Sequence, residues 1–441
     1  MRVMKFGGTS VGDPPRIANL CDIVGRALDR EPVVVVSAAS KVTDMLLTAA
    51  RHAAEGAPDA GPVARRVTAL LDAFGLDHGL IAGELQGLRE ALEALSLARA
   101  LSPEALDTVA SYGERISVRT IAAALSRQGV PADPLDAWDA GMITDDTFGA
   151  AEPLEASEAL LRERLKGRGR VPVVTGFIGK TLRGEVTTLG RGGSDYSAAI
   201  VGAAVGADEI EIWTDVPGVL SSDPRVVPEA FTIPVLSFNE AAELAYFGAK
   251  VLHPKTIHPA VRRGIPVRVK NTFAPAHPGT VITAEGDSGA SGARAIAHKR
   301  GITVVNVVST RMLLAHGFLA RIFEAFARHR VVVDLVSTSE VSVSCTVDRE
   351  DGLAAALKEL GTIGEVSVTR ERTLLCVVCA RLLGDPTVAP GIFQALGREA
   401  IPVELISMGA SAINVSLVVP DGDGERAVRA LHRELFPRAG A

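Results

Sequence analysis

A glycine-rich stretch, Thr188–Asp195, holds the residues of this sequence best suited to chemistry. Within it the order is Gly190, Arg191, Gly192, Gly193, Ser194 and Asp195. Glycine lets backbone N–H groups approach a ligand closely, and a helix that begins at such a loop adds free N–H groups and the positive end of its dipole. Phosphate is the expected ligand. Because the Asp195 carboxylate repels phosphate unless a metal ion or lysines lie between them, the stretch predicts a site for phosphate together with a cation.

A purely structural interpretation of this stretch stays open at this point. Ser194 would then be the N-cap of the helix that follows, and Asp195 would be a first-turn acid favoured by the helix dipole.

A second glycine-rich turn lies at the start of the chain. The strand Val3–Phe6 runs directly into Gly7 and Gly8. Lys5 would therefore lie near the carboxyl end of a strand, where open α/β sheets bind their ligands. Phosphate is again the natural ligand, and the alternative is a solvated surface lysine.

Two further segments allow either a functional or a capping role. The hydroxyl-rich loop Ser37–Asp44, which includes Thr43, follows the apolar run Val33–Val36. Its hydroxyls could bond a substrate or cap a helix. Ser111 and Glu114 have the spacing of a capping box, which explains Glu114 without any function.

The elements that position these residues alternate strand and helix over residues 1–285. Continuous apolar runs such as Val33–Val36 are typical of parallel strands buried on both faces. This region is therefore predicted to form a three-layer α/β domain with a mostly parallel sheet. Residues 286–300 are small and polar, and we expect them to form a linker.

The remainder of the chain repeats itself. Ile322–Phe326 recurs as Ile392–Leu396, an offset of 392 − 322 = 70 residues, and two other matches share this offset. Each unit is predicted to be an α+β ferredoxin-like βαββαβ module, one over 301–370 and one over 371–441. Neither module has clustered acid–base residues, so a role in binding or assembly is favoured over catalysis.

Composition excludes several classes of protein. The net charge of −6 gives no basic footprint for nucleic acid or an anionic membrane. Cys376 and Cys379 form a C-x-x-C pattern, but it lies inside an apolar segment typical of a buried strand. The N-terminus has no signal-peptide pattern and no apolar run is long enough for a bilayer, so we expect a cytoplasmic protein. Gly179–Thr181 lacks the earlier glycine of a Walker A motif, where Val174 stands instead.

Five motifs, in order along nearly the whole chain, together resemble the aspartate kinase (aspartokinase) family. They are Lys5–Val11, Thr175–Phe177, Thr188–Asp195, Trp213–Gly218 and Phe247–Pro254. The loop Asp145–Pro153 resembles the substrate-side loop of that family, and the two modules resemble its paired ACT domains. The resemblance implies an amino acid kinase fold and a monofunctional enzyme. It further implies that MgATP phosphorylates the β-carboxylate of L-aspartate to 4-phospho-L-aspartate, the first step of lysine, threonine and methionine biosynthesis.

The resemblance also implies roles for individual residues. Catalysis would rest on Lys5, Asp195 and Lys250. Aspartate would be bound by Thr43, Glu114, Arg191 and Ser194. ATP would be bound by Lys5, Gly7, Gly8, Thr214, Asp215, Asp223, Arg225 and Lys250. No residue is assigned as a direct protein ligand of Mg²⁺.

The first module resembles those of lysine-sensitive aspartokinases. The residues that carry this resemblance are Met312, Phe318, Leu319, Val333, Asp334, Thr338, Ser339 and Glu340. The carboxylates of Asp334 and Glu340 suit a cationic effector. We therefore expect feedback inhibition by lysine, in a homodimer or dimer of dimers assembled through the ACT domains.

Three alternative functions agree less well with these residues. Another carboxylate or carbamate kinase of the same fold would not need Glu114 and Arg191 to grip an α-amino acid. A non-catalytic amino-acid sensor would not need Lys5, Asp195 and Lys250. A fused homoserine dehydrogenase is not expected, because nothing after Ala441 would hold its nicotinamide domain.

Overall fold

The computed structural model describes residues 1–247, 252, 254–287, 289–313, 316–409 and 413–437. The chain divides into two compact units. The first consists of Met1–Val219, Pro234–Phe238 and the described residues of 251–286. The second consists of Leu220–Ile233 and the described residues of 239–250 and 287–441.

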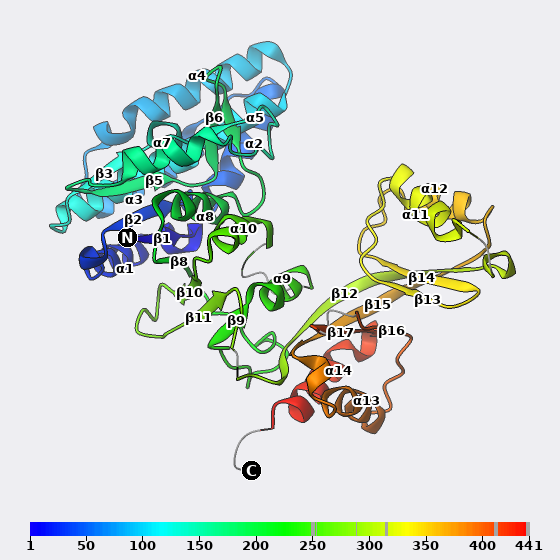
Figure 1. The fold of residues 1–441 in the computed structure, drawn as a ribbon. Helices are drawn as coiled ribbons and strands as arrows, with labels where there is room; N and C mark the ends of the chain where they lie inside the picture. The colour runs from blue at the N-terminus through cyan, green and yellow to red at the C-terminus, as the bar shows by residue number, and fades with distance from the viewer. Residues whose placement is uncertain (248–251, 253, 288, 314–315, 410–412, 438–441) are drawn as a thin grey trace. The chain divides into compact units, whose positions relative to one another are not determined.

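A mixed, mostly parallel sheet forms the centre of the first unit, with the strand order β3-β5-β2-β1-β8-β10-β11-β9 (Figure 1). Only the β10–β11 pairing among its described strands is antiparallel, as the sequence predicts for a mostly parallel sheet. The strands are β1 (Arg2–Phe6), β2 (Pro32–Val36), β3 (Ala132–Leu135), β5 (Val171–Thr175), β8 (Glu209–Thr214), β9 (Val235–Ser237), β10 (Val267–Asn271) and β11 (Thr280–Thr283).

Helices pack on both faces of this sheet. They are α1 (Pro14–Gly25), α2 (Val42–Ala54), α3 (Gly61–Ala73), α4 (Ala82–Ala98), α5 (Pro103–Arg127), α6 (Ala137–Ala140), α7 (Ala156–Leu165), α8 (Gly193–Val205) and α10 (Pro254–Arg263). α5 packs along β2, β3 and β5, whereas α8 packs across β1, β2 and β8.

The alternation of side chains along β1 decides which residues meet which helix. Met4 and Phe6 belong to the apolar core shared with α1, α2, α4 and α5. Successive side chains of a strand point to opposite faces, so Val3 and Lys5 lie on the other face, toward α8. Lys5 is thereby directed to the helix that follows the glycine-rich loop.

A small three-stranded sheet positions that loop. It consists of β4 (Ile143–Thr144), β6 (Ile178–Thr181) and β7 (Val186–Thr188), in the order β4-β6-β7. β7 ends at Thr188, immediately before the glycines, and α5 packs against it.

The second unit is built on a six-stranded antiparallel sheet with the order β13-β14-β12-β15-β17-β16. Its strands are β12 (Gly292–Val308), β13 (Val336–Thr338), β14 (Ser342–Val347), β15 (Glu365–Ala380), β16 (Leu405–Ser407) and β17 (Asn414–Pro420). Its helices include α11 (Phe318–Arg328), α12 (Leu353–Leu360), α13 (Val388–Arg398) and α14 (Gly424–Leu435). α11 and α13 keep the predicted offset, since 388 − 318 = 70.

The boundaries predicted for this part of the chain are wrong in one respect. Residues 292–300, expected to belong to a linker, form the first half of β12 and pair with the second half of β15. Ile296 lies opposite Val377 and is buried in the core of the second module, together with α13 and α14. The second module thus takes its last strand from residues that precede the first module. Small residues such as Ala295 and Ala297 are buried here, and composition alone cannot distinguish them from a linker.

The C-x-x-C pattern lies in β15, as predicted from its apolar neighbours. Cys376 and Cys379 are free and buried. Burial raises the pKa of Cys379 to about 12, so its thiol stays protonated and unreactive at neutral pH. Among the described helices, none has both the length and the apolar character needed to cross a bilayer.

Candidate active site

A cavity of about 540 Å³ opens in the first unit between the ends of β1, β2 and β7 and the start of α8. It collects seven of the residues assigned from sequence: Lys5, Gly8, Thr43, Glu114, Arg191, Ser194 and Asp195. These residues come from four separate segments of the chain, which only the fold brings together.

Lys5 and Asp195 form an ion pair across this cavity. The Lys5 Nζ atom lies 2.5 Å from Asp195 Oδ1, and both side chains are largely buried. By itself, the carboxylate of Asp195 would repel phosphate. The ammonium group of Lys5 neutralises that carboxylate, and Asp195 in turn fixes the ammonium at the end of β1.

The glycine-rich loop turns sharply into α8. Gly190 and Gly192 adopt left-handed backbone conformations, with φ of +77° and +69°. A Cβ at Gly190 would also lie 3.0 Å from the carbonyl oxygen of Gly149, so side chains are disfavoured there twice over. Gly192 is the N-cap of α8 and supplies no side-chain oxygen. The interpretation of Ser194 as the N-cap is therefore wrong, and the first-turn N–H groups are not capped by a side chain.

Glu114 occupies the middle of α5, which begins at Pro103 with Ser102 as its N-cap. The capping-box interpretation of Ser111 and Glu114 is therefore wrong, because the Ser102–Pro103 pair starts the helix earlier. Glu114 is buried, and its Oε1 atom accepts a hydrogen bond of 3.0 Å from the Ala38 N–H. Its Oε2 atom is buried without a hydrogen-bond partner among the described residues.

Burial raises the pKa of Glu114 to about 8, although the Ala38 N–H and the charge of Lys5 act against it. A buried carboxylate with one free oxygen is suited to an ammonium group, which would supply both the missing hydrogen bond and the missing charge.

Arg191 and Thr43 complete the wall of the cavity. Arg191 is exposed and makes no hydrogen bond or ion pair with the part of the chain that is described. Its planar fork is therefore available for a carboxylate. Thr43 lies in the first turn of α2 and is half-buried.

The structure shows the surroundings of only some of the residues assigned to ATP binding. Gly7 donates a 3.1 Å hydrogen bond to the Trp213 carbonyl, which puts it beside Thr214 and Asp215 at the end of β8. Asp223 and Arg225 belong to the second unit, where Arg225 Nη2 pairs with Asp223 Oδ2 at 2.6 Å. Lys250 lies outside the described residues.

The residues assigned to a lysine effector all lie in the first module of the second unit. Phe318, at the start of α11, is buried in the core of that module, and Met312 and Val333 pack against the core. Leu319, Thr338, Ser339 and Glu340 are exposed. Asp334 precedes β13 and accepts a hydrogen bond of 2.5 Å from the Tyr246 hydroxyl.

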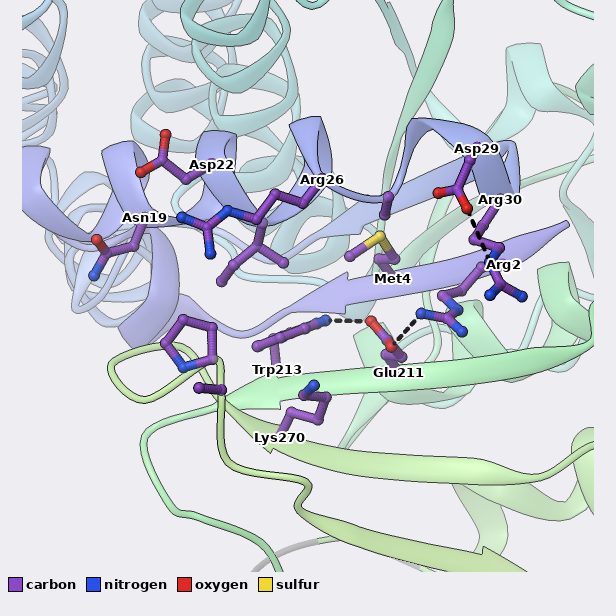
Figure 2. A pocket seen from close by; sticks show the side chains of 14 residues that line it. Arg2, Met4, Asn19, Asp22, Arg26, Asp29, Arg30, Glu211, Trp213 and Lys270 are labelled. Carbon is purple, nitrogen blue, oxygen red and sulfur yellow. Dashed lines mark hydrogen bonds and ion pairs between the residues drawn. The ribbon is translucent and has the colours of Figure 1, made fainter.

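A second cavity of the first unit has different chemistry (Figure 2). It lies between α1 and strands β8 and β10. At its centre Glu211 accepts hydrogen bonds of 2.9 Å from both Arg2 and Trp213. The buried charge here is already paired, and among the described residues none of those assigned from sequence lines this cavity.

Comparison with known proteins agrees with the motifs. Residues 1–271 match the amino acid kinase family, and residues 305–360 and 375–435 match an ACT domain. The chain is 38% identical to Aspartokinase 2, chloroplastic, of Arabidopsis thaliana, over 98% of this chain and 84% of that protein. The chain belongs to the aspartokinase family. It is also 37% identical to Lysine-sensitive aspartokinase 3 of Escherichia coli, over 98% of this chain and 99% of that one.

Solved aspartokinase structures share the fold. E. coli aspartokinase III in complex with aspartate and ADP (R-state) matches with a TM-score of 0.79 and 35% identity, covering 99% of this chain and all of that one. The same enzyme in complex with lysine and aspartate (T-state) matches with a TM-score of 0.77 and 36% identity, covering 99% of each chain. The chain is thus an aspartate kinase with ACT regulatory domains.

Sequence reasoning missed two contributors to the aspartokinase cavity. One is the backbone N–H of Ala38, which no side-chain pattern reveals. The other is Asp107, a buried carboxylate on α5. Its one available signal was that it lies seven residues, or two helical turns, before Glu114.

Proposed function

We propose that this aspartokinase transfers the γ-phosphoryl group of MgATP to the β-carboxylate of L-aspartate, which gives 4-phospho-L-aspartate and ADP. This reaction is the first step of lysine, threonine and methionine biosynthesis. One observation carries the proposal. The Lys5–Asp195 pair shares a single cavity with one oxygen of Glu114 and the guanidinium of Arg191, and neither of these two groups has a partner among the described residues.

The cavity offers complementary groups for an α-amino acid. The free oxygen of Glu114 would accept from the α-ammonium group, and Arg191 would bind the α-carboxylate in a bidentate manner. Thr43 and Ser194 would add hydrogen bonds. Held at these points, the substrate would present its β-carboxylate toward Lys5 and the start of α8.

The reaction needs charge neutralisation more than acid–base chemistry. A β-carboxylate is ionised at neutral pH and is already a nucleophile, so no general base is required. The obstacle is repulsion between this anion and the polyanionic nucleotide. Lys5, Lys250 and the N–H groups at the start of α8 would neutralise and orient the transferring group, and Asp195 would hold the lysines in place.

Mg²⁺ would enter with the nucleotide. Such ions are usually held by substrate phosphates, several waters and one or two carboxylates. Asp195 is one of the carboxylates that line this cavity, and the described residues contain no cluster of three metal-ligating side chains. When bound, the ion would supply further neutralisation of the phosphate charge.

Coupled measurement of ADP release tests the function. Aspartate, glutamate and N-acetylglutamate would be compared as acceptors at equal concentration, and we expect turnover with aspartate alone. A preference for either glutamate compound would refute the assignment.

We also propose that lysine inhibits the enzyme through the first ACT module. Support comes from Asp334, whose Oδ2 atom is buried without a hydrogen-bond partner among the described residues. A homodimer or dimer of dimers assembled through the ACT domains would transmit the inhibition by lysine. Light scattering would establish the oligomeric state. Unchanged ADP release at saturating lysine would contradict the proposed inhibition.

A further inference from the structure

Asp107 forms a buried junction beneath the cavity without lining it. The side chain is 4% exposed and projects from α5. Its Oδ2 atom accepts hydrogen bonds of 2.8 Å from the N–H groups of both Gly149 and Thr188. Its Oδ1 atom accepts a third bond of 2.8 Å from the Thr188 hydroxyl. Three donors from two separate loops therefore converge on one carboxylate.

Both loops end at the cavity. Gly149 and Thr188 contribute to its wall, and the Ala151 N–H donates a further bond of 2.9 Å to the Thr188 carbonyl. Arg191 follows Thr188 by three residues, and Gly190 between them packs closely against Gly149. Asp107 consequently fixes the point from which the Arg191 loop departs.

The same helix carries Glu114. The separation of 114 − 107 = 7 residues is close to two helical turns, so both carboxylates project from one face of α5. One end of this face reaches the cavity through Glu114, and the other end holds the loop that bears Arg191. α5 thus sets the distance between the two groups proposed to grip the amino acid.

We propose that Asp107 is a positioning residue for the amino-acid substrate, which holds the Gly149 and Thr188 loops so that Arg191 faces Glu114 across the cavity. The chemistry of a carboxylate fits this role, since it offers only acceptors to three donors. This inference rests on the proposed binding of aspartate in the cavity.

Kinetics of three variants test the inference. Asp107→Ala removes all three contacts, and we expect KM for aspartate to rise at least tenfold while KM for ATP changes less than twofold. Asp107→Asn preserves the contacts, because its amide oxygen can accept both N–H groups and its amide nitrogen can donate to the Thr188 hydroxyl. Its KM for aspartate should stay within threefold of wild type. Thr188→Val removes one contact and should raise that KM two- to fivefold.

Glu104→Ala is the matched control, because Glu104 is an exposed carboxylate in the first turn of the same helix. Both KM values should be unchanged in it. A wild-type KM for aspartate in Asp107→Ala, or equal rises in both KM values, would overturn the inference. If Asp107→Ala does not yield folded protein, Thr188→Val decides: a wild-type KM for aspartate in that variant overturns the inference as well. Absence of aspartate-dependent ADP release from the wild-type enzyme would instead refute the proposed function.

Discussion

Glu114 in the first unit is buried and Asp334 in the second is half-buried, and the two carboxylates have similar hydrogen bonding. Each has one oxygen that accepts a hydrogen bond and one that is buried without a partner among the described residues. Burial raises the pKa of both groups. Each can therefore accept a cation, which we propose to be the α-ammonium of aspartate at Glu114 and lysine at Asp334.

The two carboxylates differ in what holds the occupied oxygen. Glu114 accepts from a backbone N–H, that of Ala38, two residues past the end of β2. Asp334 accepts from the side chain of Tyr246, at the end of α9 (Phe238–Tyr246). A backbone donor is held by the main chain, whereas the side chain of the half-exposed Tyr246 can rotate away. The carboxylate proposed to bind aspartate is thus preorganised, and the carboxylate proposed to bind lysine is held by a contact that can be broken.

α9 also contacts the second ACT module within the second unit. Glu243 of this helix accepts a hydrogen bond of 2.5 Å from Asn414 on β17. Yet α9 belongs to the stretch of sequence that matches the amino acid kinase family. The carboxylate proposed to bind lysine therefore accepts a hydrogen bond from a segment that matches the kinase family.

The largest effect is expected from Asp195→Ala, which removes the fixed charge partner of Lys5. We expect kcat to fall at least about 100-fold, the scale seen when one preorganised electrostatic group is lost, with a small change in KM for aspartate. Arg191→Ala is the contrasting variant and should raise KM for aspartate more than it lowers kcat. Steady-state kinetics with both substrates measure this, and equal effects on both parameters in both variants would contradict the division of roles.

Glu114 should impose a pH dependence on aspartate use. Its folded-state pKa of about 8 lies above the usual value of about 4.3 for an unfolded chain. Only the ionised form pairs with an ammonium group, so kcat/KM for aspartate should rise with pH up to about 8 and then level off. Glu114→Gln should lower kcat/KM for aspartate about tenfold or more and abolish this rise. A rise of the same shape in the variant would show that another group titrates.

The same pKa shift bears on stability. Between about pH 4.3 and pH 8 the folded chain binds a proton at Glu114 that the unfolded chain has released. The contribution of this group to the free energy of unfolding is therefore present at low pH and is lost as pH rises toward 8. Thermal unfolding of Glu114→Gln should depend less on pH in this window than unfolding of the wild type.

Asp334→Asn should separate regulation from catalysis. The amide keeps the size of the side chain but offers no charge to a cation, so we expect inhibition by lysine to weaken about tenfold or more. Turnover without lysine should stay within twofold of wild type. Glu350→Gln provides a matched control, because Glu350 is a carboxylate of the same module that already pairs with Arg370. Equal loss of inhibition in both variants would point to a general disturbance of the module.

The smallest effect is expected from Tyr246→Phe, which removes a single hydroxyl. Without it Asp334 loses its orientation, and we expect lysine to bind two- to fivefold more weakly, as measured by calorimetry. Ala38 cannot be altered in the same manner, since its contact to Glu114 comes from the backbone. If Tyr246→Phe binds lysine as the wild type does, the contrast between a fixed and a removable contact fails.

The sequence by itself determined the features that depend on local pattern. The apolar runs predicted a mostly parallel sheet, and the offset of 70 residues predicted two related modules. Lys5, Arg191, Ser194 and Asp195 lie beside glycines whose conformational freedom leaves a clear trace in sequence. The motifs also predicted the family, because their order and spacing are preserved along the chain.

Only the tertiary structure decided which distant residues meet. The i, i+3 spacing of Ser111 and Glu114 is the same at a helix start and inside a helix. The structure places them inside α5, because Ser102 and Pro103 begin that helix earlier. Residues 292–300 resembled a linker until their pairing with β15, some 80 residues along the chain, made them part of the second module. The only local signal of Asp107 was its spacing of seven residues from Glu114. Its role depends on its hydrogen-bond donors, which come from the Gly149 loop and from Thr188 at the end of β7.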